Sequence, residues 1–541
     1  MLKNYFSMLK REFAGYNAAK LASDLLAGLT VAAVALPLAL AFGVSSGADA
    51  AAGLITAIIA GLVISALSGA SFQISGPTGA MSAILIGIVA THGLNAVFFV
   101  SFIAGVILLV CGIFRLGKLV ALIPRPVITG FTSGIALIIA LGQIDNFFGT
   151  VSEGTSAVAK LGSYFTLGFK PHLTTLLLGL IVVAVMLIWP KKWNAKVPSS
   201  LVGIIVSTIV YVIFRFDGVA TVGEIPRTLF PEARFSLASI DFSAIGSLLP
   251  SAITVAALGM IESLLCGASA SRMKNEPFNA DIELIAQGVG NILIPFFGGV
   301  PATAAIARTS VAIKSGAKTR LTGIFHAVWL LVVMFALGGV MKLIPLSALG
   351  GVLIVTAWRM NEWDAIKYMF GKKFTGAIVQ FFVTMIATVL FDLTIAIVIG
   401  IVVSLVIFVK NAAHIDVTVS ELNEEKIPGR ENYEAIAAYV NGTIFFANAN
   451  ALAHALEAMP ERGEVILSLE GVSNIDITGI ETLTEYIEDK KAHGVHVLVC
   501  GMNGSLTHAF DKSGLTDKLG AENIYPVMDA ALGVADMAAA K

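Results

Sequence analysis

The chain has 541 residues, of which 57% are hydrophobic and 13% are charged, and its mean hydropathy is +0.87. This composition excludes an ordinary soluble enzyme and predicts a protein that crosses a lipid bilayer many times. The formal net charge of -1 gives no basic surplus of the kind that binding to nucleic acid would require. The three cysteines, Cys111, Cys266 and Cys500, lack metal-binding or redox spacing, so no metal site and no cofactor are expected.

Residues 1–20 form a basic, amphipathic segment without the apolar core and cleavage site of a signal peptide, so we expect a cytoplasmic lead-in. From residue 21 to residue 412 apolar blocks alternate with short polar breaks, which predicts the membrane domain. The predicted spans are approximately 23–43, 51–70, 96–114, 126–144, 172–189, 198–214, 249–268, 322–340, 374–391 and 394–409.

Two further apolar blocks, 77–91 and 301–314, rise only roughly 20 Å as helices, whereas the hydrocarbon core of a bilayer is about 30 Å thick. Each begins with a small-Pro-small cluster, SGPTGAMSA (75–83) and GVPATAAIA (299–307), which predicts a half-helix with proline in its first turn. Short interrupted segments at matching places predict a transporter of about fourteen segments in two inverted repeats of seven, with its site at the midplane.

Basic residues between the apolar blocks predict the orientation of the domain. If the N-terminus is cytoplasmic, all of these residues fall on cytoplasmic turns, and both termini are then expected on the cytoplasmic side. They are Arg115, Lys118, Arg125, Lys191, Lys192, Lys196, Arg272, Lys274, Lys314, Lys318, Arg320, Arg359, Lys367, Lys372 and Lys373.

Two charged residues lie within apolar segments, where charge is costly. Arg308 stands inside the second short block, at a depth that costs about 2.5 to 3.5 kcal/mol. Two half-helix N-termini meeting there would attract an anion, which would offset this cost; the alternative is a side chain that snorkels to the interface. Glu262 is the one acidic residue of its span and is expected to couple transport to an ion, with Arg308 or a cation as partner. The alternative is an Arg-Glu pair that only fixes helix packing.

Smaller residues around the half-helices are further candidates for the site. Hydroxyl groups can donate to the oxygens of an anion, and small residues let a ligand approach the backbone, although they also serve ordinary helix packing. Phe42 follows a break at Pro37 and is a candidate wall of the pocket. The hydroxyl and small candidates are Ser75, Gly76, Thr78, Gly79, Ser82, Thr303, Ala304 and Ala305.

The C-terminal part, residues 413–541, has frequent charged residues and no apolar run long enough to span a bilayer. Strand-like runs such as EVILSLEG alternate with helix-like runs such as TGIETLTEYIEDKKAHG. This pattern predicts a small cytoplasmic α/β domain with helices covering a sheet.

Several blocks, taken in order, resemble a SulP-type anion permease with a C-terminal STAS domain. The resemblance covers nearly the whole chain and implies seven-plus-seven inverted repeats, divided into a core domain that carries the substrate and a gate domain that mediates homodimerisation. It also implies elevator-like movement of the core. The blocks that carry it are DLLAGLTVAAVALPLALAFG (24–43), QISGPTGAMSA (73–83), IPRPVITGFTSGIA (123–136), GMIESLL (259–265) and the stretch 279–319.

The resemblance also implies roles for individual residues. Glu262 matches the family's acidic position, which is linked to sodium in some members and to protons or exchange in others. Cys266 stands where sodium-coupled members have a hydroxyl, and a thiol is a poor ligand for Na+, so proton coupling is preferred to sodium coupling. Leu38 replaces a glutamine found in many members. The implied substrate pocket consists of Phe42, Thr78, Ala304, Ala305, Ile306 and Arg308.

In the C-terminal domain, the stretch EGVSNIDITGIETL (470–483) resembles the STAS segment that carries a phosphorylatable residue, and Thr478 occupies that place. The alternative is that Asp476 or Thr478 only caps the following helix. A cytoplasmic partner of this domain is a further expectation.

The predicted function is secondary transport of a small anion across the cytoplasmic membrane. Bicarbonate and sulfate are the first candidates, followed by dicarboxylates. The alternatives are an anion channel or exchanger, a nucleobase permease of the same architecture, and a membrane-anchored signalling protein. An enzyme is not expected, because no nucleophile-base constellation is found.

Overall fold

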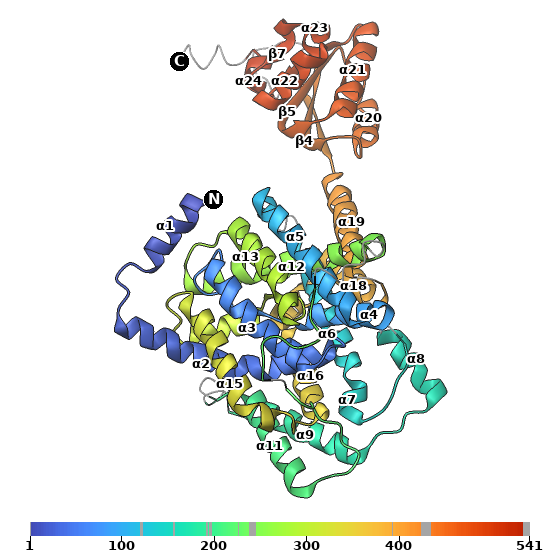
Figure 1. Ribbon diagram of the computed structural model, residues 1–541. Coiled ribbons are helices and arrows are strands. Elements are labelled where there is room, and N and C mark those ends of the chain that lie inside the picture. Colours follow the sequence, from blue (N-terminus) through green and yellow to red (C-terminus); the bar gives the residue numbers. More distant parts are fainter. Residues whose placement is uncertain are drawn as a thin grey trace. The chain divides into compact units, whose positions relative to one another are not determined.

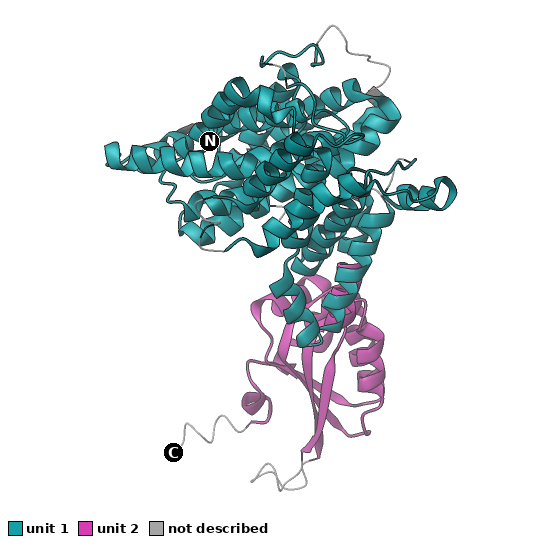
Figure 2. Cartoon of the chain, turned by 90° about the horizontal axis from the view of Figure 1, so that it is seen from below, with its two compact units in different colours: residues 1–401 teal, residues 402–541 magenta. Residues whose placement is uncertain are grey.

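The computed structural model describes residues 2–118, 123–154, 157–190, 193, 197–225, 227–236, 245–391, 393–422 and 434–533. Of the loop cations considered above, Lys191, Lys192 and Lys196 lie outside these residues. The chain forms two compact units, Met1–Ile401 and Val402–Lys541 (Figure 2). The division falls inside a helix, α19, whose last residue is the predicted end of the membrane domain.

The first unit is mainly helical (Figure 1). Eight stretches of the described chain are long and apolar enough to cross a bilayer. They are α2 (Ala18–Ser45), α3 (Ala50–Leu67), α5 (Leu94–Ile113), α6 with α7 (Arg125–Gly142 and Ile144–Phe148), α12 (Ile245–Lys274), α13 with η4 (Ala280–Leu293 and Ile294–Phe297), α15 (Leu321–Met341) and α19 (Leu393–Ala412).

Shorter helices complete the unit. Those with an apolar composition are α4 (Gly79–His92), α9 (Leu173–Ile188), α11 (Ser199–Phe214), α16 (Leu346–Met360) and α18 (Thr375–Leu390). The others are α1 (Leu2–Glu12), α8 (Ala157–Leu167), α14 (Ile306–Lys314) and α17 (Trp363–Gly371).

Each of the ten predicted spans falls on one of these helices, so the prediction of a polytopic helical domain is confirmed. Helices α13 and α16 lie outside the predicted spans. Helix α13 carries Glu283, Gln287 and Asn291 at intervals of four residues, and all three are buried. These polar groups face other protein groups instead of lipid, and they lower the hydropathy on which the prediction of spans depends.

Glycines allow the helices that hold the site to pack backbone against backbone. A Cβ atom added at Gly105 of α5 would lie 2.6 Å from the backbone nitrogen of Ile292, and one at Gly288 of α13 would lie 2.5 Å from that of Leu109. Helices α5 and α13 therefore touch along their main chains, a contact that membrane helices make through small residues.

The two predicted half-helices are present as α4 and α14, and a short strand precedes each of them. Strand β1 (Ser75–Gly76) pairs antiparallel with β2 (Thr303–Ala304). Because each strand leads into its helix, this pairing brings the two helix N-termini to one place. The expected proline in the first helical turn is wrong: Pro77 comes before the N-cap Thr78, and Pro301 comes before β2.

The second unit has a five-stranded sheet in the order β3-β4-β5-β6-β7. Strand β3 is antiparallel to β4, and the other neighbours are parallel. Leu452, Leu483 and Phe510, from three different helices, share one buried cluster with apolar residues of the strands. The predicted α/β domain is confirmed. Its elements are β3 (Asp416–Leu422), β4 (Ala435–Ile444), α20 (Ala449–Glu457), β5 (Glu464–Ile475), α21 (Ile477–Ala492), β6 (His496–Cys500), α22 (Gly504–Ser513), α23 (Leu515–Leu519), η5 (Ala521–Asn523), β7 (Ile524–Tyr525) and α24 (Met528–Ala531).

Candidate functional site

The site lies where α4 and α14 begin. Thr78 is the N-cap residue of α4 and Ala305 is that of α14, and neither side chain makes a capping hydrogen bond. The first backbone N-H groups of a helix have no partner within the helix, so an uncapped N-terminus offers donors and a partial positive charge. Two such N-termini next to each other favour an anion.

Glu262 of α12 faces these N-termini. Its Oε2 accepts a hydrogen bond from the Thr78 hydroxyl at 2.8 Å and a second from the Thr303 hydroxyl at 2.6 Å. The two threonine oxygens lie 3.3 Å apart. The predicted partner, Arg308, does not pair with it directly, since the ion pairs within the described part of the chain do not include Glu262. The carboxylate is therefore held by two hydroxyl groups.

Arg308, in the first turn of α14, is buried with 1% of its surface exposed. Its Nη2 donates to the carbonyl oxygen of Pro77 at 2.8 Å, and its Nη1 has no hydrogen-bond partner among the residues that the structure describes. A Cβ atom at Gly76 would lie 2.6 Å from Nη1. The guanidinium is thus packed against the turn that precedes α4. It does not extend to the interface, so the snorkelling alternative is wrong.

The remaining pocket candidates lie around the same N-termini. Phe42 is buried, and a Cβ atom at Gly79 would lie 3.0 Å from its ring, so the ring packs on the first residue of α4. Ala304 is buried in β2, Ala305 is half-buried, and 49% of Ile306 is exposed. The exposed start of α14 therefore borders open space. Leu38, the other apolar residue that was noted, is buried one turn before Phe42 on α2.

Side chains that the sequence did not single out support this arrangement. The Oγ of Ser263 accepts from the backbone nitrogen of Ala304 at 3.2 Å, and the backbone carbonyl of Ser263 accepts from the amide of Gln73 at 2.8 Å. The amide of Gln287 donates to the Ser75 hydroxyl at 2.8 Å. Ser263 follows Glu262 directly. Gln287 lies in the four-residue polar repeat of α13, and that repeat is the feature of the sequence from which Gln287 could have been predicted.

Cys266, one turn after Glu262, faces α14. Its thiol donates to the Thr309 hydroxyl at 3.4 Å, and that hydroxyl accepts from the backbone nitrogen of Ile74 at 3.0 Å. Cys266 is fully buried, and these two hydrogen bonds connect α12, α14 and the residue before β1. A cysteine that packs in this way leaves one polar ligand fewer for a hard cation at this position.

In the second unit, Asp476 caps helix α21. Its side chain accepts from the backbone nitrogens of Gly479 and Phe446, both at 2.9 Å. Thr478 lies within the first turn and is half-buried. Asp476 and Thr478 were the two predicted capping residues, and the structure shows that Asp476 is the N-cap residue. The hydroxyl of Thr478 does not take part in the cap.

Comparison with known proteins finds matches for both parts of the chain. Residues 21–387 match the sulfate permease family, and residues 427–531 match the STAS domain. The chain is 33% identical over 536 residues to YvdB of Bacillus subtilis, which is named as a candidate sulfate transporter; the match covers 96% of this chain and 99% of that protein. It is 30% identical over 516 residues to the bicarbonate transporter BicA of Picosynechococcus sp., which covers 90% of each chain.

Solved structures match as well. The transmembrane domain of a cyanobacterial bicarbonate transporter, BicA, aligns with a TM-score of 0.66 at 32% identity, and the alignment covers 71% of this chain and 98% of that one. The murine anion transporter Slc26a9, in the inward-facing state, aligns with a TM-score of 0.82 at 16% identity over 96% of this chain and 92% of that one, a likeness of fold alone. This chain belongs to the sulfate permease family and carries a C-terminal STAS domain.

Proposed function

We propose that the protein is a secondary active transporter of a small anion, with bicarbonate or sulfate as substrate and dicarboxylates as the next candidates. One observation carries the proposal: Arg308 is buried beside two uncapped helix N-termini, and its Nη1 has no hydrogen-bond partner within the described residues. A buried cation with free donors is costly unless an anion pairs with it. The names of the bicarbonate and sulfate transporters among the relatives support an oxyanion.

The substrate would be bound by groups that a small oxyanion can reach together. The N-H groups at the start of α4 and α14 would supply neutral donors, and Nη1 of Arg308 would supply a charged one. Phe42 and Ile306 would form apolar walls beside them. A nucleobase is less well suited, because the second broken helix presents a cation at this place and no carboxylate.

We propose that Glu262 couples anion transport to the movement of an ion, and that this ion is a proton in preference to a sodium ion. Its carboxylate lies next to the site through Thr78 and Thr303, and a single proton on it would change the net charge that the anion meets. Sodium is the second candidate, because the thiol of Cys266 is engaged with Thr309 and is a soft ligand.

The movement that we propose is elevator-like. Residues 21–412 would form the membrane domain, which lies in the cytoplasmic membrane, and residues 413–541 would form the STAS domain. Both termini would lie on the cytoplasmic side. Since β1 and β2 are paired, α4 and α14 would move together as parts of one core against a gate, and the gate would hold a homodimer together.

Uptake by the purified protein in liposomes tests this function. Labelled bicarbonate, sulfate and succinate are offered separately, each with an inward proton gradient, with an inward sodium gradient, and with neither. We expect uphill uptake of one anion with one gradient. Glu262→Gln should abolish accumulation and Arg308→Ala should weaken anion binding, while both proteins keep the elution profile of the wild type. Uptake of none of the three anions would refute the proposal, and currents above carrier rates without uphill uptake would indicate a channel.

A further inference from the structure

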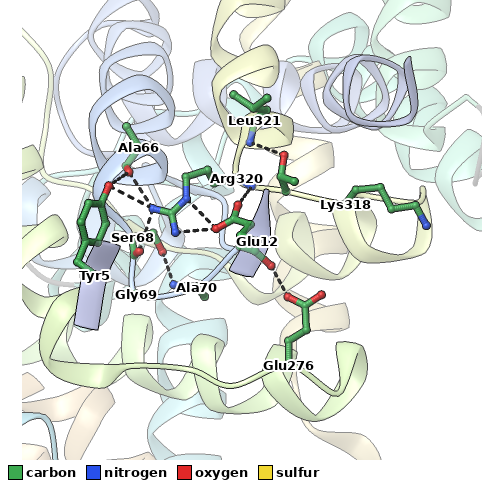
Figure 3. A network of polar contacts seen from close by, with 12 residues as sticks. Tyr5, Glu12, Ala66, Ser68, Gly69, Ala70, Glu276, Lys318, Arg320 and Leu321 are labelled. Atoms are coloured by element: carbon green, nitrogen blue, oxygen red, sulfur yellow. Dashed lines mark hydrogen bonds and ion pairs between the residues drawn. The ribbon is translucent and has the colours of Figure 1, made fainter. Parts of the chain in front are cut away.

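Helix α1 is fixed to the membrane unit by one of its faces. The residues on this face, Tyr5, Met8, Leu9 and Glu12, are all partly buried. Tyr5 donates to the backbone carbonyl of Ala66, at the end of α3, at 2.7 Å (Figure 3). These four residues are spaced so that they lie on one side of the helix, and the opposite side is exposed.

The strongest contact on the fixed face is a buried ion pair between Glu12 and Arg320. Oε2 of Glu12 accepts from Nε of Arg320 at 2.9 Å and from its Nη2 at 2.8 Å, and Oε1 accepts from the backbone nitrogen of Arg320 at 2.6 Å (Figure 3). The two side chains are only 4% and 5% exposed. Such a two-pronged pair fixes direction as well as distance. The contacts between Glu12 and Arg320 therefore fix the orientation of α1 within the membrane unit.

Arg320 also connects α1 to the end of α3. Its Nη1 donates to the carbonyl oxygens of Ala66 at 2.8 Å and Ser68 at 3.2 Å, and its guanidinium lies 5.4 Å from the centre of the Tyr5 ring. Since Arg320 immediately precedes α15, these contacts join α1, α3 and α15. A ligand that bound the opposite face of α1 would thus also be linked, through Arg320, to the ends of α3 and α15.

The outer face of α1 carries positive charge and one aromatic ring. Lys3, Lys10 and Arg11 are exposed, and 62% of Phe6 is exposed between them. This face has no carboxylate, because Glu12, the acidic residue of α1, is turned inward. The ion pairs recorded for the described residues do not involve these three cations. The face is thus complementary to negative charge.

The start of α2 places this face near the bilayer. Helix α2 begins at Ala18, six positions after Glu12, and exposes Leu21, Leu25 and Leu29 within its first turns. Exposed leucines on a spanning helix are suited to hydrocarbon. A connection of this length reaches at most roughly 20 Å, so α1 cannot be far from the interface.

We propose that the face of α1 formed by Lys3, Phe6, Lys10 and Arg11 binds the headgroups of anionic phospholipids. The three cations attract negatively charged lipid, and the ring of Phe6 enters the boundary between headgroups and acyl chains, as in other basic amphipathic helices at membrane surfaces. Because Glu12 and Tyr5 occupy the opposite face, lipid binding does not compete with the contacts to α3 and α15. The inference does not depend on which anion is transported.

Hydrogen-deuterium exchange of the full-length protein in nanodiscs tests this inference. Nanodiscs of phosphatidylcholine alone are compared with nanodiscs that contain phosphatidylcholine and phosphatidylglycerol. We expect backbone exchange in residues 2–12 to slow several-fold when phosphatidylglycerol is present, and we expect the difference to vanish in concentrated salt, which screens surface charge. Equal exchange in the two lipids would overturn the proposal.

Two triple variants separate charge from structure. Lys3→Gln/Lys10→Gln/Arg11→Gln should lose the lipid-dependent slowing, because each basic residue near a charged surface contributes roughly fivefold in affinity. Lys3→Arg/Lys10→Arg/Arg11→Lys keeps the charge and should respond as the wild type does. Exchange in α3 and α15, the helices whose ends α1 contacts, serves as the check that each variant is folded. A triple-Gln variant that still responds to phosphatidylglycerol as the wild type does would refute the role of these cations.

Discussion

The hydroxyl of Thr303 lies 2.6 Å from Oε2 of Glu262 and donates a hydrogen bond to it. This contact joins the strand before one half-helix to the half-buried acid of α12, and Thr78 makes the equivalent contact from the other half-helix at 2.8 Å. Glu262 therefore accepts hydrogen bonds from the residues that precede both broken helices.

The first prediction concerns this contact. Thr303→Val removes one of the two donors to the carboxylate while keeping the shape of the side chain. A hydrogen bond to a charged group contributes about 1.5–3 kcal/mol, so we expect anion uptake to fall at least tenfold. Thr303→Ser keeps the hydroxyl and should retain most of the uptake. Uptake assays in liposomes measure both variants, and equal loss in Thr303→Val and Thr303→Ser would indicate a packing effect only.

The second prediction concerns the glycine beneath Arg308. A Cβ atom at Gly76 would lie 2.6 Å from Nη1, so Gly76→Ala should displace the guanidinium and weaken anion binding. A matched control is Gly87→Ala on α4, where no atom lies within 4 Å of the added Cβ. Anion affinity, measured by calorimetry on the purified proteins, should fall for Gly76→Ala and stay unchanged for Gly87→Ala. Equal affinities for the two variants would contradict the placement of Arg308 in the site.

The third prediction concerns the buried ion pair of α1. Removing one partner leaves the other as an uncompensated buried charge, which costs about 3–5 kcal/mol, so Glu12→Gln and Arg320→Gln should each lower the melting midpoint of the membrane unit. The double variant should lose less than the two single losses combined. The exposed pair of Lys342 and Glu224 is the control, and Lys342→Gln should change stability by about 1 kcal/mol or less. Additive losses in the double variant would show that the pair is not coupled.

The fourth prediction distinguishes capping from regulation in the second unit. Asp476→Ala removes the cap of α21 and should destabilise that unit by about 1 kcal/mol. Thr478→Ala should leave stability nearly unchanged, because the hydroxyl of Thr478 does not cap the helix. Thermal unfolding measures both effects. Transport by Thr478→Ala is then compared with the wild type: a difference would support a regulatory role for this residue, and identical transport would exclude one.

The sequence was sufficient to predict the features that depend on local composition. Ten spans and both half-helices follow from apolar length and from the small-Pro-small clusters. The start of α14 was misplaced by five residues, because the residues after Pro301 form a strand, and the partner of that strand, residues 75–76, lies far away in the sequence. A single segment does not reveal such a pairing.

Contacts across the site were harder to predict. The positions of Arg308 and Glu262 stood out because charge in an apolar segment is rare, but their direct pairing was not found. Arg308 donates to the carbonyl oxygen of Pro77 in the first broken segment, whereas Glu262 accepts from Thr78 in the first and from Thr303 in the second. The supporting residues Ser263 and Gln287 were missed, because small polar residues inside membrane helices serve packing as often as function.

The pairing of β1 with β2 also has a consequence for how the protein is made. Thr78 and Thr303 are 225 residues apart. At the usual pace of translation, about 5–20 residues per second, roughly 11–45 s pass between synthesis of the first strand and synthesis of its partner. Until then the backbone groups of Ser75 and Gly76 lack the partners that they have in the finished fold, and an apolar bilayer cannot supply substitutes. The hydrogen bonds between β1 and β2 can therefore form only after the second half of the chain has been synthesised.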